Sequence, residues 1–166
     1  MNIKFKEKKV FVFDWDGTVF DSMAIKVENF SRVILESIGD RTGITLMQAR
    51  NSYRLHSGKP RKEIFALIAS EFGLDLGDEE MDAISSKLTT LNTDRLANAA
   101  IFADAHHLLD YLTTTGRRTY ISSSVPSTEL QALVEMKLPS GLREKLAGVY
   151  GSDSSFTKGK EHLKKV

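Results

Sequence analysis

Four apolar residues that favour β-strands, Val-Phe-Val-Phe at positions 10–13, run directly into two aspartates, Asp14 and Asp16. An unbroken apolar run predicts a strand buried on both faces, as in a parallel sheet covered by helices. Such sheets carry their chemistry beyond the carboxyl ends of their strands, so we expect Asp14 at the tip of this strand. Gly17 permits a sharp turn there, which would let both carboxylates face one pocket.

The composition excludes several classes of protein. With 41% hydrophobic and 27% charged residues, the chain is globular rather than disordered. A net charge of +1 creates no field that attracts nucleic acid or an anionic membrane, so we expect neither as a partner. The absence of cysteine excludes disulfides and thiolate metal sites; it is compatible with a reducing cytosol, and we expect a cytoplasmic protein.

A long segment after the first strand has helical spacing of its apolar residues. We expect a helix capped by Ser22 and ending at Gly39, and further helices over residues 46–55, 60–72 and 78–96. No alternating strand pattern occurs in this segment. Residues 21–97 are therefore predicted to form a helical domain inserted into a sheet domain made of residues 1–20 and 98–166.

The remainder returns to alternating helices and strands. The pattern predicts helices over residues 104–115, 126–137 and 142–146, strands over residues 119–122 and 148–150, and a last helix beginning at Lys158. This alternation predicts an α/β fold with a parallel sheet.

The sequence FDWDGTVFDS at positions 13–22 resembles the first motif of the haloacid dehalogenase superfamily. A bare Asp-x-Asp is common in acidic turns, but the preceding strand and the following Gly-Thr make this match specific. The resemblance implies a Rossmann-like core, here lacking its C-terminal part, with an inserted helical cap. The all-helical cap is similar to that of the phosphoglycolate phosphatase and β-phosphoglucomutase branch.

Three serines, Ser122, Ser123 and Ser124, stand where a predicted strand ends and a helix begins. Free backbone N–H groups at a helix start favour an anion, although a serine there can simply cap the helix. In the superfamily's second motif a Ser or Thr binds the phosphoryl group. The match to this motif implies that Ser123, with Ser124 beside it, binds phosphate, and Ser122 is the alternative register.

Cationic side chains occur at two further positions that match the superfamily. Lys158 follows the third predicted strand where the third motif has its lysine, and Lys160 is the alternative. A cation there neutralises the phosphoryl oxygens. Within the predicted cap, Lys59 and Arg61 lie in a Gly-x-x-Arg loop that resembles a substrate-binding loop, although Arg61 can equally be an exposed residue of a first helical turn.

Metal binding is implied by the resemblance rather than by any cluster. The four histidines (His56, His106, His107 and His162) do not have the spacing of a metal site. The superfamily implies Mg²⁺ held by the Asp14 side chain and the Asp16 carbonyl, with Asp153 as a further candidate or merely a solvated loop residue.

The fourth motif, an acidic pair after a fourth strand, has no counterpart before Val166. In the superfamily that strand lies beside the first one. We therefore expect either that these residues are part of a longer protein or that the apolar edge at residues 10–13 self-associates or is covered by a partner.

Together these features predict an enzyme, a Mg²⁺-dependent phosphohydrolase that acts on a small phosphorylated metabolite. The resemblance implies that Asp14 attacks phosphorus to form an aspartyl phosphate and that Asp16 is the general acid and base. The nearest alternative is a phosphomutase with the same machinery. A rival from another class is a truncated, non-catalytic protein with this fold.

Overall fold

The computed structural model describes residues 7–153 and 156–166, which form two compact units. One unit comprises Ser22–Ala99, and the other is built from the chain before and after that segment. We call them the helical unit and the sheet unit. Within the described residues, no helix is both long and apolar enough to cross a membrane.

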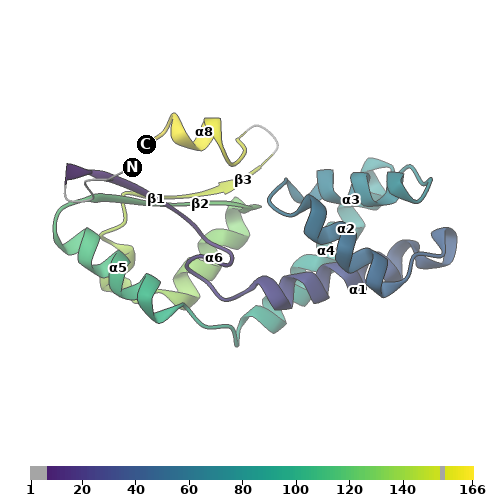
Figure 1. The fold of residues 1–166 in the computed structure, drawn as a ribbon, viewed down its shortest axis with the longest axis horizontal. Helices are drawn as coiled ribbons and strands as arrows, with labels where there is room; N and C mark the ends of the chain where they lie inside the picture. Colours follow the sequence, from purple (N-terminus) through teal and green to yellow (C-terminus); the bar gives the residue numbers. More distant parts are fainter. Residues whose placement is uncertain (1–6, 154–155) are drawn as a thin grey trace. The chain divides into compact units, whose positions relative to one another are not determined.

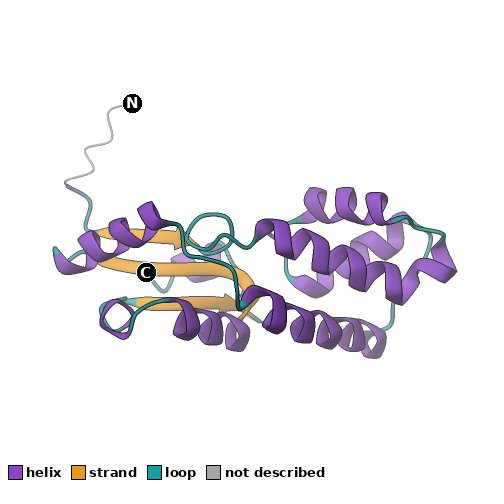
Figure 2. Cartoon of the chain, turned by 90° about the horizontal axis from the view of Figure 1, so that it is seen from below, coloured by secondary structure: helices purple, strands orange, loops and turns teal. Residues whose placement is uncertain are grey.

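The sheet unit contains a three-stranded parallel sheet with the order β1-β2-β3. The helices α5, α6 and α7 accompany one face, and the short α8 lies over the other (Figure 1; Figure 2). The strands lie side by side and all point the same way, so their carboxyl ends share one edge of the sheet. The bounds are β1 (Val10–Asp14), α5 (Ala103–Thr114), β2 (Arg118–Pro126), α6 (Ser127–Lys137), α7 (Ser140–Arg143), β3 (Gly148–Ser152) and α8 (Lys160–Leu163).

The first strand is less buried than its sequence predicts. β1 is an edge strand of the described sheet, and Val12 is 38% exposed while its neighbours in the strand are half-buried. The expectation of burial on both faces is therefore wrong. The reason is that, within the described residues, β1 has a neighbouring strand on one side only. Val12, two residues before Asp14, also lies on the sheet face of Ser122, which contacts the short α8 through His162.

The second strand is longer than expected and changes the setting of the three serines. β2 continues to Pro126, with an irregular register between Ser122 and Pro126, and α6 begins only at Ser127. The serines therefore lie within the extended strand and do not cap α6.

Gly151 in β3 packs closely against the start of α6. A Cβ on Gly151 would lie 2.5 Å from Ser127 Cα, so this position requires glycine.

The helical unit consists of α1 (Met23–Thr42), α2 (Leu46–His56), α3 (Arg61–Glu71) and α4 (Asp78–Leu96). Its core is a continuous apolar cluster contributed by all four helices. At the centre, the Phe30 ring stacks on Tyr53 at 4.4 Å and contacts Phe65 at 4.6 Å between centroids. Aromatic pairs at such distances contribute beyond their buried area.

Several helix boundaries differ from the sequence-based expectation. α1 does not end at Gly39 but continues to Thr42, where Gly43 adopts the left-handed conformation with φ of 68° and donates its N–H to the Gly39 carbonyl. Ser22 occupies the N-cap position without forming a side-chain capping bond. α7 covers Ser140–Arg143, so it begins two residues before and ends three residues before the expected helix over 142–146. α8 begins at Lys160, two residues after the expected start at Lys158.

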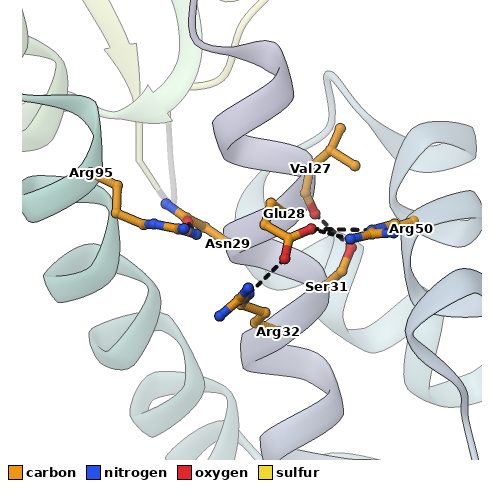
Figure 3. A network of polar contacts seen from close by, with 7 residues as sticks. All are labelled: Val27, Glu28, Asn29, Ser31, Arg32, Arg50 and Arg95. Atoms are coloured by element: carbon orange, nitrogen blue, oxygen red, sulfur yellow. Dashed lines mark hydrogen bonds and ion pairs between the residues drawn. The ribbon is translucent and has the colours of Figure 1, made fainter. Parts of the chain in front are cut away.

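A polar network on α1 links the helices of this unit (Figure 3). The Glu28 carboxylate accepts hydrogen bonds from Arg32 on its own helix and from Arg50 on α2, and these bonds lower its pKa. On another side of α1, Asn29 donates to the Asn92 side chain at 3.0 Å and accepts from Arg95 at 2.9 Å. The network therefore cross-links α1 to both α2 and α4.

Candidate active site

Asp14 occupies the carboxyl end of β1, and the chain turns sharply after it. The Asp14 Oδ1 atom accepts a hydrogen bond from the Trp15 N–H at 2.8 Å. Gly17 adopts a φ of 71°, a conformation that favours glycine, and its N–H donates to the Phe20 carbonyl at 2.9 Å. Trp15 is fully buried against Phe20, so the turn is anchored in the core. Asp16 lies within this turn, half-buried.

Lys158 reaches Asp14 from the chain segment that follows β3. Its Nζ atom lies 2.7 Å from Asp14 Oδ1, with the lysine side chain 29% and the aspartate side chain 41% exposed. The Lys158 backbone is held by its N–H, which donates to Ser152 Oγ at the end of β3. Lys160 instead lies at the start of α8 and is exposed. Of the two candidate lysines, the structure therefore brings Lys158 to Asp14.

Ser122 rather than Ser123 shares a sheet face with Asp14. The register of β1 and β2 pairs Asp14 with Ser122 directly. Successive side chains of a strand point to opposite faces, so Ser123 points away from Asp14. The Ser123 hydroxyl is buried and accepts the Val125 N–H at 3.2 Å, and Ser124 is half-buried. The geometry thus favours Ser122, the alternative register, as the serine beside Asp14.

His162 is a residue of this site that the sequence did not indicate. It lies on α8, is only 1% exposed, and its Nδ1 is 2.8 Å from Ser122 Oγ. Its ring stacks on Phe156 at 4.5 Å and meets Tyr150 edge-on at 5.9 Å. Burial lowers the pKa of His162, because the charged imidazolium would lose its hydration. Forty positions separate it from Ser122, so no local spacing reveals the pair.

The acidic residues near the strand ends do not form a cluster of three. Within residues 7–153 and 156–166, no group of three histidine, cysteine, aspartate or glutamate side chains is arranged to hold a metal. Asp153 is exposed, and its Oδ2 accepts a hydrogen bond from Ser127 at 3.1 Å. The Asp14 carboxylate and the Asp16 backbone carbonyl nevertheless offer oxygen donors, the type that Mg²⁺ prefers, and this ion commonly keeps several waters besides.

Lys59 and Arg61, the sequence-based candidates for substrate contact, belong to the helical unit. Arg61 donates from Nη1 to the Thr89 hydroxyl at 2.7 Å and approaches the Ser85 carbonyl at 3.5 Å, so it cross-links α3 to α4. Lys59 forms an ion pair with Glu63 one helical turn away. In the structure, both cations are therefore engaged with neighbours in their own unit.

A further feature of the helical unit is an open pocket of about 440 Å³. It is lined by Ala24, Ile25, Glu28, Asp94, Arg95 and Asn98. Two of these residues, Glu28 and Arg95, also belong to the polar network of α1. Their charged side chains in the pocket wall are therefore held in place by hydrogen bonds.

The sequence matches no family model, and it matches no curated protein. The structure, by contrast, resembles several solved structures over most of its length. A protein described as a haloacid dehalogenase-like hydrolase from Bacteroides fragilis aligns with a TM-score of 0.73 at 19% identity, over 96% of this chain and 71% of that one. A protein described as a phosphoglycolate phosphatase from Haemophilus somnus aligns with a TM-score of 0.66 at 13% identity, over 92% and 66%.

CbbY from Rhodobacter sphaeroides, crystallised with xylulose-1,5-bisphosphate, aligns with a TM-score of 0.68 at 17% identity. That alignment covers 91% of this chain and 66% of CbbY. The chain spans about two thirds of the length of the structures it resembles, between 62% and 71% for the first four. The prediction of an α/β fold is confirmed: this chain has the fold of the haloacid dehalogenase-like hydrolases, with a helical insert between its first and second strands.

Proposed function

We propose that this protein is a phosphohydrolase that cleaves phosphate monoesters through an aspartyl-phosphate intermediate on Asp14. The observation that carries this proposal is the contact of Lys158 with Asp14 at the carboxyl end of β1. A half-exposed ion pair contributes about 0–1 kcal/mol to stability, so the fold itself gains little from it. The ion pair lies at the carboxyl ends of the strands, where parallel sheets bind ligands, and this location supports a role in catalysis instead.

The chemistry begins with an attack on phosphorus. An Asp14 carboxylate oxygen would form a bond to the phosphorus atom while the bond to the ester oxygen breaks. Asp16, two residues later in the turn, would protonate the departing oxygen and then take a proton from the water that hydrolyses the intermediate. Because a phosphate dianion and a carboxylate repel each other, this attack needs positive charge close to both.

Lys158 and a serine hydroxyl of β2 supply charge and a hydrogen bond for the phosphoryl group in this proposal. Lys158 Nζ, already beside Asp14 Oδ1, would neutralise part of the charge on the phosphoryl oxygens. The register partner of Asp14 supports Ser122 as the hydroxyl donor, in preference to Ser123 or Ser124. Such donors act strongly because they are already aimed at the position where charge develops.

Mg²⁺ is the cofactor that we propose, with the Asp14 carboxylate and the Asp16 backbone carbonyl as its protein ligands. When bound, the ion would supply positive charge that reduces repulsion between the phosphate and the carboxylate. The proposed substrate is a small phosphorylated metabolite, a proposal supported by the sugar bisphosphate in the CbbY structure. Arg61 and Lys59 remain proposed contacts for the part of the substrate remote from phosphorus.

The test is phosphate release from p-nitrophenyl phosphate by the purified chain, measured with Mg²⁺ and with excess EDTA. We expect turnover with Mg²⁺ and its loss with EDTA. Acid quenching during turnover followed by peptide mass analysis should find one phosphoryl group on the peptide that contains Asp14. A phosphoryl group on a different residue, or equal turnover in EDTA, would contradict the mechanism.

A further inference from the structure

His162 is the most deeply buried titratable side chain among those near Asp14, and the proposed reaction does not use it. It lies on α8, four residues after Lys158, so one short segment delivers a cation to Asp14 and an imidazole to Ser122. Both contacts are made on the same face of the sheet, because Asp14 and Ser122 are register partners. A polar side chain buried to this extent lowers stability unless it is hydrogen-bonded, so the contact with Ser122 is the one that compensates for burying the ring.

The surroundings favour the neutral form of the imidazole. Phe156 stacks on one side of the ring and Tyr150 lies at its edge. Burial lowers the pKa of His162 most; the Lys158 charge lowers it further, while the Asp153 charge and the Gly151 and Phe156 backbone carbonyls act in the opposite direction. Glu161 precedes it on α8. A neutral imidazole has one nitrogen that donates and one that accepts.

The unbonded nitrogen indicates which tautomer is present. His162 Nε2 is buried, and within the described part of the chain no acceptor lies in hydrogen-bond geometry with it; the Gly151 and Phe156 carbonyls lie near enough to act on the pKa of the ring without meeting that geometry. A proton on Nε2 would therefore bury an unsatisfied donor, and buried N–H groups without a partner are rare. A proton on Nδ1 instead makes use of the 2.8 Å contact with Ser122 Oγ.

The tautomer of His162 determines where the single O–H of Ser122 can donate. If Nδ1 were the acceptor, the Ser122 O–H would donate to His162 and could not donate to a ligand. If Nδ1–H donates, the hydroxyl keeps its proton for another acceptor. We propose that His162 is a positioning residue whose Nδ1–H donates to Ser122 Oγ and so directs the Ser122 proton to an oxygen of the phosphoryl group bound beside Asp14. This inference rests on the proposed phosphohydrolase function for the identity of the anion.

The first test reads the tautomer directly in the free protein. Nitrogen-15 NMR of the chain labelled at histidine, near neutral pH, should show a protonated Nδ1 and an unprotonated Nε2 for His162. The resonance is assigned by its absence from His162→Phe. A protonated Nε2 with a bare Nδ1 would overturn the proposal. Because this reading needs no turnover, it is independent of the proposed function.

The second test measures the dissociation constant of inorganic phosphate in the presence of Mg²⁺ for a set of variants. His162→Phe keeps an aromatic ring against Phe156 but removes the donor, and we expect about tenfold weaker binding, the loss of one hydrogen bond to a charged group. Ser122→Ala should weaken binding similarly, and the double variant should be no worse than Ser122→Ala alone. An additive double variant would show that His162 acts without Ser122, which overturns the proposal.

Two further variants separate positioning from mere packing. His162→Asn retains an N–H donor near the place of Nδ1 and should restore part of the affinity lost in His162→Phe. His107→Phe on α5, an exposed histidine, should bind phosphate as the wild type does. Failure of His162→Asn to improve on His162→Phe, with both variants folded by circular dichroism, would argue against the donor role. A wild type that neither binds nor releases phosphate, yet has the Nδ1–H tautomer, would overturn the proposed function instead.

Discussion

The two units bury polar side chains in different ways. In the helical unit the buried Asn29 and Asn92 bond to each other, and Arg95 completes the set, so the polar groups are satisfied between helices. In the sheet unit the buried Ser122 and His162 bond to each other beside a half-exposed ion pair at the strand ends. Buried polarity in the first unit therefore serves the fold, whereas in the second it surrounds groups that solvent and ligands can reach.

The units also differ in how they complete their apolar cores. The helical unit closes its core around Phe30, Tyr53 and Phe65, with no strand edge among its residues. The sheet unit buries Trp15 fully but leaves Val12 in β1 38% exposed at the edge of the described sheet. Changes in the first unit should therefore act on stability, and changes at the strand ends of the second should act on activity.

The largest expected effect is on activity. Asp14→Asn should lower phosphate release by at least about a thousandfold, or about 4 kcal/mol in activation free energy, because the amide lacks the nucleophilic charge. Its thermal stability should stay close to that of the wild type, since the ion pair with Lys158 is half-exposed. Asp110→Asn, an exposed carboxylate on α5, is the matched control and should retain full turnover. Equal rates in Asp14→Asn and the wild type would remove Asp14 as the nucleophile.

The next largest effect should fall on the stability of the helical unit. Phe65 is fully buried, and Phe65→Ala should lower the free energy of unfolding by about 3–5 kcal/mol, since it removes apolar contacts and leaves a cavity. Leu55→Ala, at a side chain 75% exposed, should change it by less than about 0.5 kcal/mol. Urea unfolding followed by circular dichroism measures both values, and similar losses in the two variants would contradict the described core.

The single tryptophan sharpens this experiment. Trp15 lies in the sheet unit, so its fluorescence reports that unit, while circular dichroism is dominated by the helices, most of whose residues lie in the helical unit. We expect Phe65→Ala to lower the midpoint seen by circular dichroism more than the midpoint seen by fluorescence. Equal shifts would mean that the units unfold as one, and that their different packing does not separate their stability.

A smaller effect is expected from the polar network of α1. Asn29→Ala should cost about 1–3 kcal/mol, because it leaves the buried Asn92 oxygen without this donor and removes the acceptor of Arg95. Asn51→Ala, an exposed asparagine on α2, is the control and should be nearly neutral. The same urea titration measures the difference. A neutral Asn29→Ala would mean that this buried polarity does not hold the helices together.

The sequence predicted those features that depend on neighbours along the chain. The apolar run before Asp14, Gly17 after it and the helical spacing in residues 21–97 are local signals, and most elements lie close to their expected positions. The end of α1 was misplaced because a helix tolerates an internal glycine at a cost of about 1 kcal/mol, and Gly39 is such a residue. The left-handed cap is supplied by Gly43 instead.

Features that depend on residues far apart in the sequence were harder to predict. The strand β2 continues past the serines, so the serine that faces Asp14 follows from the register between strands rather than from the motif. The proximity of Lys158 to Asp14 was anticipated only through resemblance to a family. The burial of His162 depends on Phe156, Tyr150 and Ser122, which come together only in the folded chain.

The smallest expected effect is the pH dependence of stability that His162 adds. Burial lowers its pKa below the ordinary value of 6.5, so on acidification the unfolded chain takes up a proton before the folded protein does. The contribution of His162 is therefore fully present above pH 6.5 and is lost as the pH falls through the lowered pKa.

The measurement is the free energy of unfolding against pH for the wild type and His162→Phe. The wild type should lose stability more steeply just below pH 6.5, while the variant should be flatter in that range. Glu28 and Glu71 have pKa values lowered by hydrogen bonds, chiefly from Arg32 and Ser52 respectively, so their contributions are lost below pH 4.5 in both proteins and do not obscure the comparison. Parallel curves above that pH would mean that His162 is hydrated in solution, and that the sheet unit does not bury a titratable group beside its ion pair.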